Sequence, residues 1–187
     1  MKNSLANLKN PTTVLSILAI LLIIAQIAVM FIPCFNMTPV ATRKNPNPQP
    51  KEYSLFSFCW SECEEMNKII KKQVDDYQPN DFAMGIVLPN AFGLLTIIFM
   101  VIELKNLFQN YKVGGAKAVK ILSNLCCLLW GGLSVYGFMT SPIFGFCVEG
   151  SSVQMIQICI GAAGLVIALI RAAIAFAGRT RYVVKAK

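Results

Sequence analysis

Four long apolar runs constrain the fold of this chain more than any other feature. They cover about residues 14–33, 82–104, 119–140 and 154–177 of the 187-residue sequence. Each run has about the 20 residues that a helix needs to cross roughly 30 Å of hydrocarbon, whereas a helix of a water-soluble domain carries a polar face. The runs therefore predict an all-α membrane protein. We expect one domain over residues 1–187, built as a four-helix transmembrane bundle with an extracytoplasmic insert between spans one and two.

Composition agrees with a membrane protein and excludes several kinds of chemistry. Only 14% of the residues are charged, against about a quarter in soluble domains. The chain has no histidine, which excludes histidine metal ligands, histidine general bases and Ser-His or Cys-His nucleophile pairs. We therefore expect no metal site, no cofactor and no catalytic residue.

The positions of the basic residues predict the orientation in the membrane. They gather before span one, between spans two and three and after span four, at Lys2, Lys9, Lys105, Lys112, Lys117, Lys120, Arg179, Arg181, Lys185 and Lys187. Cytoplasmic segments carry such an excess, so we expect both termini in the cytoplasm and the insert on the outer side of the cell membrane. Topology and anionic lipid explain the net charge of +8, and we expect no nucleic-acid partner.

The insert, at residues 34–81, has three parts. Alternating prolines make residues 45–50 an extended spacer. The aromatic, β-prone residues 53–58 predict either one short strand or an aromatic patch at the membrane surface. Apolar residues then recur at steps of three and four over residues 61–77, behind a Ser-x-x-Glu capping box. This last pattern predicts an amphipathic helix.

Four cysteines fall on the predicted outer side: Cys34, Cys59, Cys63 and Cys147. An even number in an oxidising compartment favours two structural disulfides, for which three pairings are possible. A bond from the insert to Cys147 would clamp the two outer links together, whereas a Cys59–Cys63 bond would lock the start of the helix. We favour at least one bond that includes Cys147.

The same cysteines leave a redox function open. Small four-span bundles with paired outer cysteines resemble the membrane enzymes that pass electrons from protein thiols to a quinone. Those enzymes carry a Cys-x-x-Cys pair and a second exchanging pair, which implies thiol-disulfide exchange at Cys59 and Cys63 here. The spacing in this chain is one residue longer, Cys59-x-x-x-Cys63, and the second outer link holds only Cys147.

Among the polar and charged side chains within the predicted spans, four are candidates for a membrane-buried site: Asn90, Glu103, Asn124 and Arg171. A charge at the centre of the membrane costs about 3 kcal/mol and marks a functional site, although near a helix end an arginine snorkels to the headgroups. If Arg171 needs a partner, Glu103 is the expected one. An ion or substrate path through Arg171 is the alternative, which would make the chain a small transporter or channel subunit. Pro89 predicts a bend in span two, and Asn90 needs a partner inside the bundle.

Small residues recur along span four, among them Gly161, Gly164 and Ala168. Such a stripe lets membrane helices approach closely. It predicts packing within the four-helix bundle, and the alternative is a homo-oligomer through the same residues.

The layout resembles two groups of four-span proteins. A long first outer loop, a short second one and both termini inside are similar to the claudin-like proteins, although residues 53–63 lack the Gly-Leu-Trp of their first loop. The Phe31-Ile32-Pro33 end of span one, followed by an aromatic-rich insert, resembles small uncharacterised four-span membrane proteins of bacteria. Neither resemblance implies an activity.

Together these features predict a non-enzymatic integral membrane protein of the structural or interaction kind, a scaffold or accessory subunit. It would present a disulfide-stapled outer loop to a protein partner, with the lipid bilayer around its spans. Thiol-disulfide exchange and a transporter or channel role are the two alternatives.

Overall fold

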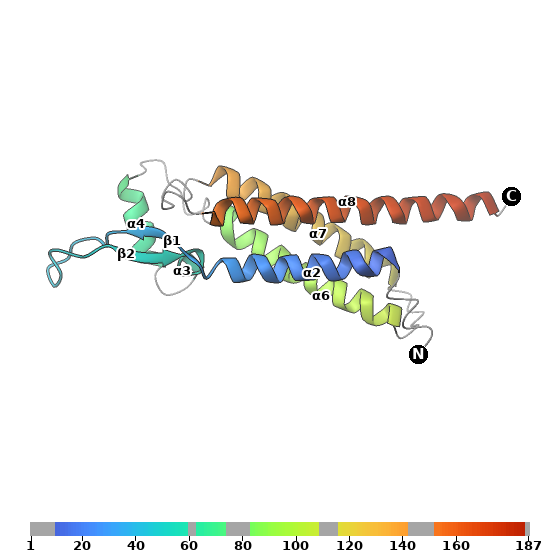
Figure 1. The fold of residues 1–187 in the computed structure, drawn as a ribbon, viewed down its shortest axis with the longest axis horizontal. Helices are drawn as coiled ribbons and strands as arrows, with labels where there is room; N and C mark the ends of the chain where they lie inside the picture. Colours follow the sequence, from blue (N-terminus) through green and yellow to red (C-terminus); the bar gives the residue numbers. More distant parts are fainter. Residues whose placement is uncertain (1–9, 60–62, 74–82, 109–115, 142–151, 186–187) are drawn as a thin grey trace.

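The computed structural model describes residues 10–59, 63–73, 83–108, 116–141 and 152–185. Four helices in these ranges are long and apolar enough to cross a membrane, at Pro11–Val29, Gly85–Phe108, Lys117–Thr140 and Val153–Ala177. They belong to α2 (Pro11–Val29), α6 (Leu88–Phe108), α7 (Ala116–Thr140) and α8 (Val153–Lys185). The four helices form a bundle, beyond which α8 continues (Figure 1). The prediction of a helical chain with four membrane-spanning helices is confirmed.

The first span begins where the sequence supplies a helix cap. Pro11 takes the first helical position, and Oδ1 of Asn10 accepts a hydrogen bond from the backbone N–H of Thr12 at 3.1 Å. Both residue types favour these positions, because asparagine satisfies a free N–H and proline has none to lose. The buried face of these first turns carries the hydroxyl groups of Thr12, Thr13 and Ser16.

The second span begins with a wider turn. The π-helix η1 (Ala83–Val87) leads directly into α6. Pro89 has no N–H to donate to the preceding turn, and Nδ2 of Asn90 donates to the carbonyl oxygen of Ile86 at 2.7 Å. The partner that Asn90 needs is therefore a carbonyl group of its own span.

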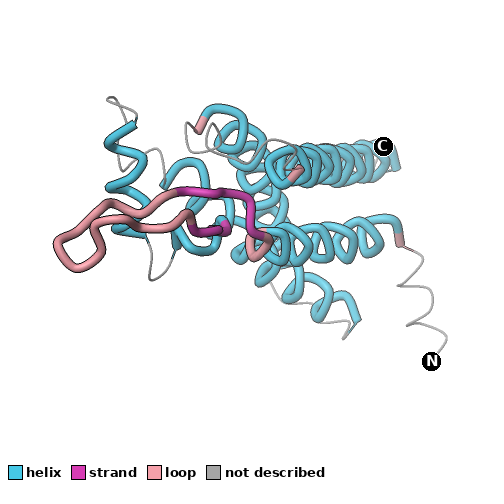
Figure 2. The backbone as a smooth tube through the Cα atoms, turned by 60° about the vertical axis from the view of Figure 1, so that its left-hand side comes forward, coloured by secondary structure: helices cyan, strands magenta, loops and turns pink. Residues whose placement is uncertain are grey.

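The insert begins as a two-stranded antiparallel ribbon. Strand β1 (Pro33–Met37) pairs with β2 (Lys51–Ser54) and places Phe35 opposite Tyr53. The ribbon and its connecting loop project beyond the bundle (Figure 2). Two short helices follow, α3 (Leu55–Cys59) and α4 (Cys63–Gln73).

The structure corrects the expected organisation of the insert. A single strand over residues 53–58 is wrong, because β2 ends at Ser54 and α3 begins at Leu55. The backbone N–H of Ser54 donates to Oγ of Ser57 at 3.3 Å, which is the side-chain contact that starts a helix in a capping box. Strand β1 was not expected at all. The predicted helix over residues 61–77 is described from Cys63 to Gln73, and its other residues lie outside the described ranges.

An exposed ion pair lies on the surface of α4. Nζ of Lys68 is 2.7 Å from Oε1 of Glu64, four residues earlier. The hydrogen bond and the positive charge of Lys68 lower the pKa of the Glu64 carboxyl. Such exposed pairs add little to stability, because water screens both charges.

One hydrophobic cluster joins the insert to the ends of the spans. From the insert it includes Phe35, Tyr53, Leu55, Met66 and Ile70, and from the spans Met30, Ile86, Phe138 and Val153. Phe56 adds to the attachment, since its N–H donates to the Met30 carbonyl at 2.9 Å and its ring stacks on Phe31 with centroids 4.4 Å apart. Burial of a large apolar side chain contributes about 1.5–3 kcal/mol. The insert is therefore packed on one end of the bundle.

Helices α7 and α8 approach each other through glycine. A Cβ atom on Gly131 would lie 2.7 Å from the backbone nitrogen of Leu165, and one on Gly161 would lie 2.6 Å from Cβ of Ser134. A Cβ on Gly164 would meet Cζ3 of Trp130 at 2.3 Å. The predicted stripe of small residues in span four thus packs inside the chain, where Ala168 is also fully buried.

The glycine contacts yield a test with a neighbouring residue as control. We expect Gly131→Ala to lower the free energy of unfolding by about 1–3 kcal/mol, because the added methyl group overpacks against backbone atoms that cannot move independently. Gly132→Ala should change stability little, since its Cβ would lie 3.9 Å from Leu165 Cδ2, an ordinary contact. Detergent-induced unfolding of the two variants, followed by circular dichroism, measures the difference. Equal stabilities would contradict the close approach.

Candidate functional site

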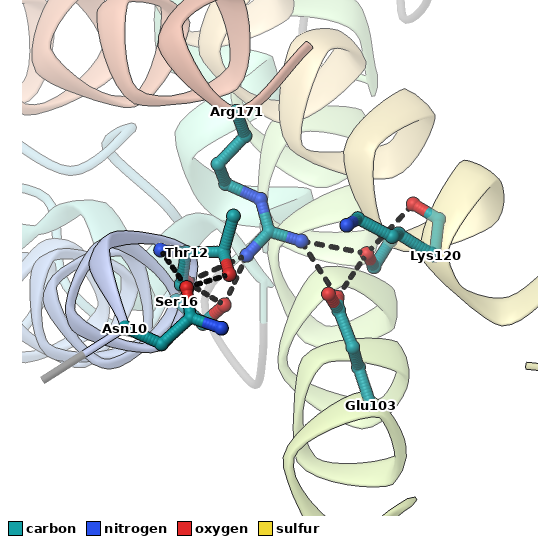
Figure 3. A network of polar contacts seen from close by, with 7 residues as sticks. Asn10, Thr12, Ser16, Glu103, Lys120 and Arg171 are labelled. Carbon is teal, nitrogen blue, oxygen red and sulfur yellow. Dashed lines mark hydrogen bonds and ion pairs between the residues drawn. The ribbon is translucent and has the colours of Figure 1, made fainter. Parts of the chain in front are cut away.

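Arg171 is the most deeply buried charge among the described residues, with 2% of its surface exposed. It reaches from α8 into the space between α2 and α6 (Figure 3). There its Nη2 lies 2.6 Å from Oε2 of Glu103 and 3.0 Å from Oγ of Ser123. Its Nη1 donates to Oγ of Ser16 and, at 3.4 Å, to the carbonyl oxygen of Thr12. The structure therefore brings together Arg171 and Glu103, the partner that the sequence suggested.

The two serines extend the pair into a network that touches all four spans. Ser16 in α2 donates to the Thr12 carbonyl at 2.8 Å, and Ser123 in α7 donates to Glu103 at 2.8 Å. Each hydroxyl group can accept a hydrogen bond from Arg171 and donate its own hydrogen to a second acceptor. Hydrogen bonds to ionised groups are about twice as strong as neutral ones. The network therefore fixes α2, α6, α7 and α8 at one level of the bundle.

The ion pair matters more for arrangement than for net stability. Removing two charges from water costs several kcal/mol per ion, which the attraction between them only roughly offsets. Loss of one partner is different, because it leaves the other charge buried without compensation, at about 3–5 kcal/mol. The four helices are thus restricted to arrangements that keep Arg171 next to Glu103.

A cavity of about 440 Å³ lies next to the network, between α7 and α8. Arg171 and Asn124 line it, together with two lysines and several apolar residues. Within the described part of the chain, neither Nε of Arg171 nor Oδ1 of Asn124 has a hydrogen-bond partner, although both atoms are buried. Asn124 therefore lies beside Arg171, whereas Asn90 lies in the span-two turn described above.

A second polar cluster lies further along the bundle. Nε1 of Trp130 donates to Oε1 of Gln26 at 2.7 Å, and Nε2 of Gln26 donates to Oγ of Ser134 at 3.1 Å. Nε2 of Gln157 donates to the backbone carbonyl of Gln26 at 3.1 Å. Sequence reasoning missed Gln26 as a site residue, although an uncharged amide inside a long apolar run is the signal that could have found it.

Of the four cysteines on the predicted outer side, the structure describes the side chain of one, Cys34. Cys34 is buried in the cluster beneath the insert. Cys59 and Cys63 lie at the end of α3 and the start of α4, where the structure describes the backbone alone, and Cys147 lies outside the described ranges. The disulfides therefore stay a prediction. Among the residues that the structure describes, no three cysteine or acidic side chains gather in a way that could hold a metal ion.

The four apolar helices make this chain a multi-pass membrane protein. Comparison with protein-family models, with curated proteins and with solved structures gives no match at any point of the chain. The function must therefore be argued from the molecule itself.

The buried pair can be tested against the exposed one. We expect Glu103→Gln to destabilise the bundle by about 3–5 kcal/mol, because Arg171 keeps its charge and loses its counter-ion. Glu64→Gln removes an ion pair that is exposed and should change stability little. The free energy of unfolding of purified protein in mixed micelles measures both effects.

A double substitution separates charge from packing. Glu103→Leu combined with Arg171→Met removes both charges while keeping apolar volume, and should recover most of the stability lost in Glu103→Gln. A double variant no more stable than Glu103→Gln would show that an uncompensated charge is not the cause of the loss, because the double variant no longer carries that charge.

Proposed function

We propose that this chain is a non-enzymatic protein of the cell membrane, a scaffold or accessory subunit that presents its insert to a protein partner. The observation that carries the proposal is the hydrophobic cluster shared by the insert and the span ends. A segment held in this way keeps its shape before a partner arrives. Binding to it then loses less conformational freedom than binding to a loose loop.

The free end of the ribbon is the surface that we propose for contact. The loop between β1 and β2 forms a turn in which the Thr42 N–H donates to the Asn45 carbonyl at 3.0 Å and the Asn45 N–H donates to the Thr42 carbonyl at 3.1 Å. Arg43 and Lys44 are exposed at this turn. The prolines of residues 45–50 restrict the returning chain. The loop thus presents two positive charges on a backbone whose conformation is restricted.

The orientation is part of the proposal. The ribbon lies at one end of the bundle, and the start of α2 lies at the other (Figure 1). Lys105 near the end of α6 and Lys117 near the start of α7 belong to the second end. An excess of basic residues there supports a cytoplasmic location for that end, and we propose that the insert, at the opposite end, lies outside. We include disulfides among Cys34, Cys59, Cys63 and Cys147 in the same proposal, because an outer insert lies in an oxidising compartment.

The described residues give less support to the two alternative functions, transport and thiol-disulfide exchange. A charge on a transport path is expected to meet water or substrate, whereas Arg171 is paired with Glu103 and hydrogen-bonded to two serines. Thiol exchange would depend on Cys59 and Cys63, whose side chains the structure does not describe. The interaction function is the one supported by a described contact, the hydrophobic cluster between the insert and the span ends, and it is the one that we propose.

Labelling of introduced cysteines in intact cells tests the orientation. A membrane-impermeant maleimide should modify Thr42→Cys directly and should modify Lys112→Cys, between spans two and three, only after the cells are permeabilised. The unsubstituted protein gives the background from the native cysteines. Labelling of Lys112→Cys in intact cells would overturn the topology.

Photo-crosslinking tests the interaction function. A photoreactive residue at Arg43 should yield a discrete protein adduct in cells that naturally make this protein, because the loop is the proposed contact. The matched control is Leu169, a lipid-facing residue of α8 with 60% of its surface exposed, which should give no protein adduct. If Arg43, Lys44 and Asn47 all fail to give an adduct that Leu169 lacks, the proposed function is wrong.

A further inference from the structure

The cavity between α7 and α8 has a charged part and an apolar part. Its polar lining consists of Lys117, Lys120, Asn124 and Arg171. Its apolar lining consists of Ile121, Leu125, Leu128, Ala172, Ala175 and Phe176. A site of this composition suits a molecule that is itself charged at one end and apolar at the other.

The charged part of the cavity carries an unbalanced positive charge. Three of its lining residues are cationic, and none of the described residues that line it is acidic. Glu103 neutralises Arg171 through Nη2, which leaves the charges of Lys117 and Lys120. The arrangement therefore favours an anion.

Two buried atoms at the cavity lack partners. Nε of Arg171 is a donor and Oδ1 of Asn124 an acceptor, and neither is hydrogen-bonded within the described residues. A buried donor or acceptor left in this state costs about 1–3 kcal/mol. Each atom exposes less than 1 Å², so a phosphate oxygen can accept from Nε, and a headgroup hydroxyl can donate to Oδ1, only after a small shift of the neighbouring side chains. The unpartnered atoms thus point to a polar ligand.

The apolar lining opens toward the surrounding hydrocarbon. Ile121, Leu125 and Phe176 are 57%, 49% and 71% exposed, on helices that cross the membrane. Lys117 is near the start of α7, and Leu128 lies eleven residues further on, roughly 16 Å along the axis. The charges therefore lie near the level of lipid headgroups, and the apolar lining continues inward from them.

We propose that this cavity binds one anionic phospholipid of the adjacent leaflet. The phosphate lies among Lys117, Lys120 and Nε of Arg171, and an acyl chain lies along Leu125 and Phe176. A dissolved anion fits the site less well, because the open side of the cavity faces hydrocarbon. Basic pockets between transmembrane helices are known to recognise such headgroups. The site is independent of the insert and of its proposed partner.

Native mass spectrometry of the full-length protein in uncharged detergent tests the proposal. The probes are phosphatidylglycerol, phosphatidylcholine with the same acyl chains, and inorganic phosphate. We expect phosphatidylglycerol to be retained preferentially. Lys120→Gln should weaken its binding roughly fivefold, because that is the contribution of one basic residue to the binding of an anionic headgroup. The matched control is Lys105→Gln, at the same end of the bundle and outside the cavity, which should leave binding unchanged.

A second variant tests the apolar part without altering charge. Leu125→Trp fills the space proposed for the acyl chain and should weaken retention of phosphatidylglycerol while the thermal unfolding midpoint stays close to that of the parent protein. Three results would overturn the proposal. They are equal retention of the two lipids, an equal loss in Lys105→Gln and Lys120→Gln, or displacement of phosphatidylglycerol by millimolar inorganic phosphate, which would assign the site to a free anion.

Discussion

The ion pair between Arg171 and Glu103 is the constraint on which the arrangement of the helices depends. Between transmembrane helices the surrounding lipid is as apolar as the side chains, so hydrophobicity alone does not select one packing over another. A buried guanidinium does select, because only an arrangement that supplies a carboxylate and several hydroxyl groups avoids a large penalty. Glu103 in α6, Ser16 in α2 and Ser123 in α7 meet that requirement together. Arg171 of α8, through its contacts with the other three spans, thus determines which helices lie next to one another in the bundle.

Four different kinds of contact hold the bundle at three levels. The charged network lies at the end where α2 begins, and the amides of Gln26 and Gln157 connect α2, α7 and α8 further along. Direct backbone approach at Gly131 and Gly161 brings α7 against α8. At the other end the contact is hydrophobic, through the cluster shared with the insert. Because the chemistry differs at each level, a helix that slid or rotated would lose several unlike contacts at once.

Sequence reasoning reached the parts of this structure that depend on local composition. Hydropathy predicts the four spans because each crosses the same thickness of hydrocarbon, and the depth of Arg171 and Glu103 in their spans suggested their pairing. The pairing of β1 with β2 could not be read in this way, since it depends on partners far apart in the chain and β propensity varies with context. Residues 53–58 divide between strand and helix at Ser54, where the backbone N–H bonds to Oγ of Ser57, and the β-prone composition of the segment gives no sign of this boundary. The cavity beside Arg171 could not be predicted either, because its lining comes from two helices whose relative packing the sequence does not specify.

The shared cluster also has a consequence for biogenesis. The ribbon and α3 precede the second span in the chain, yet their core includes Phe138 near the end of α7 and Val153 at the start of α8. During synthesis the insert therefore emerges with an apolar face whose covering residues have not yet been made. Exposed apolar surface and unpaired strand edges promote misassembly. The insert can reach its final packing only when Val153, at the start of the last span, is in place, so folding of the insert is completed after the last span has been made.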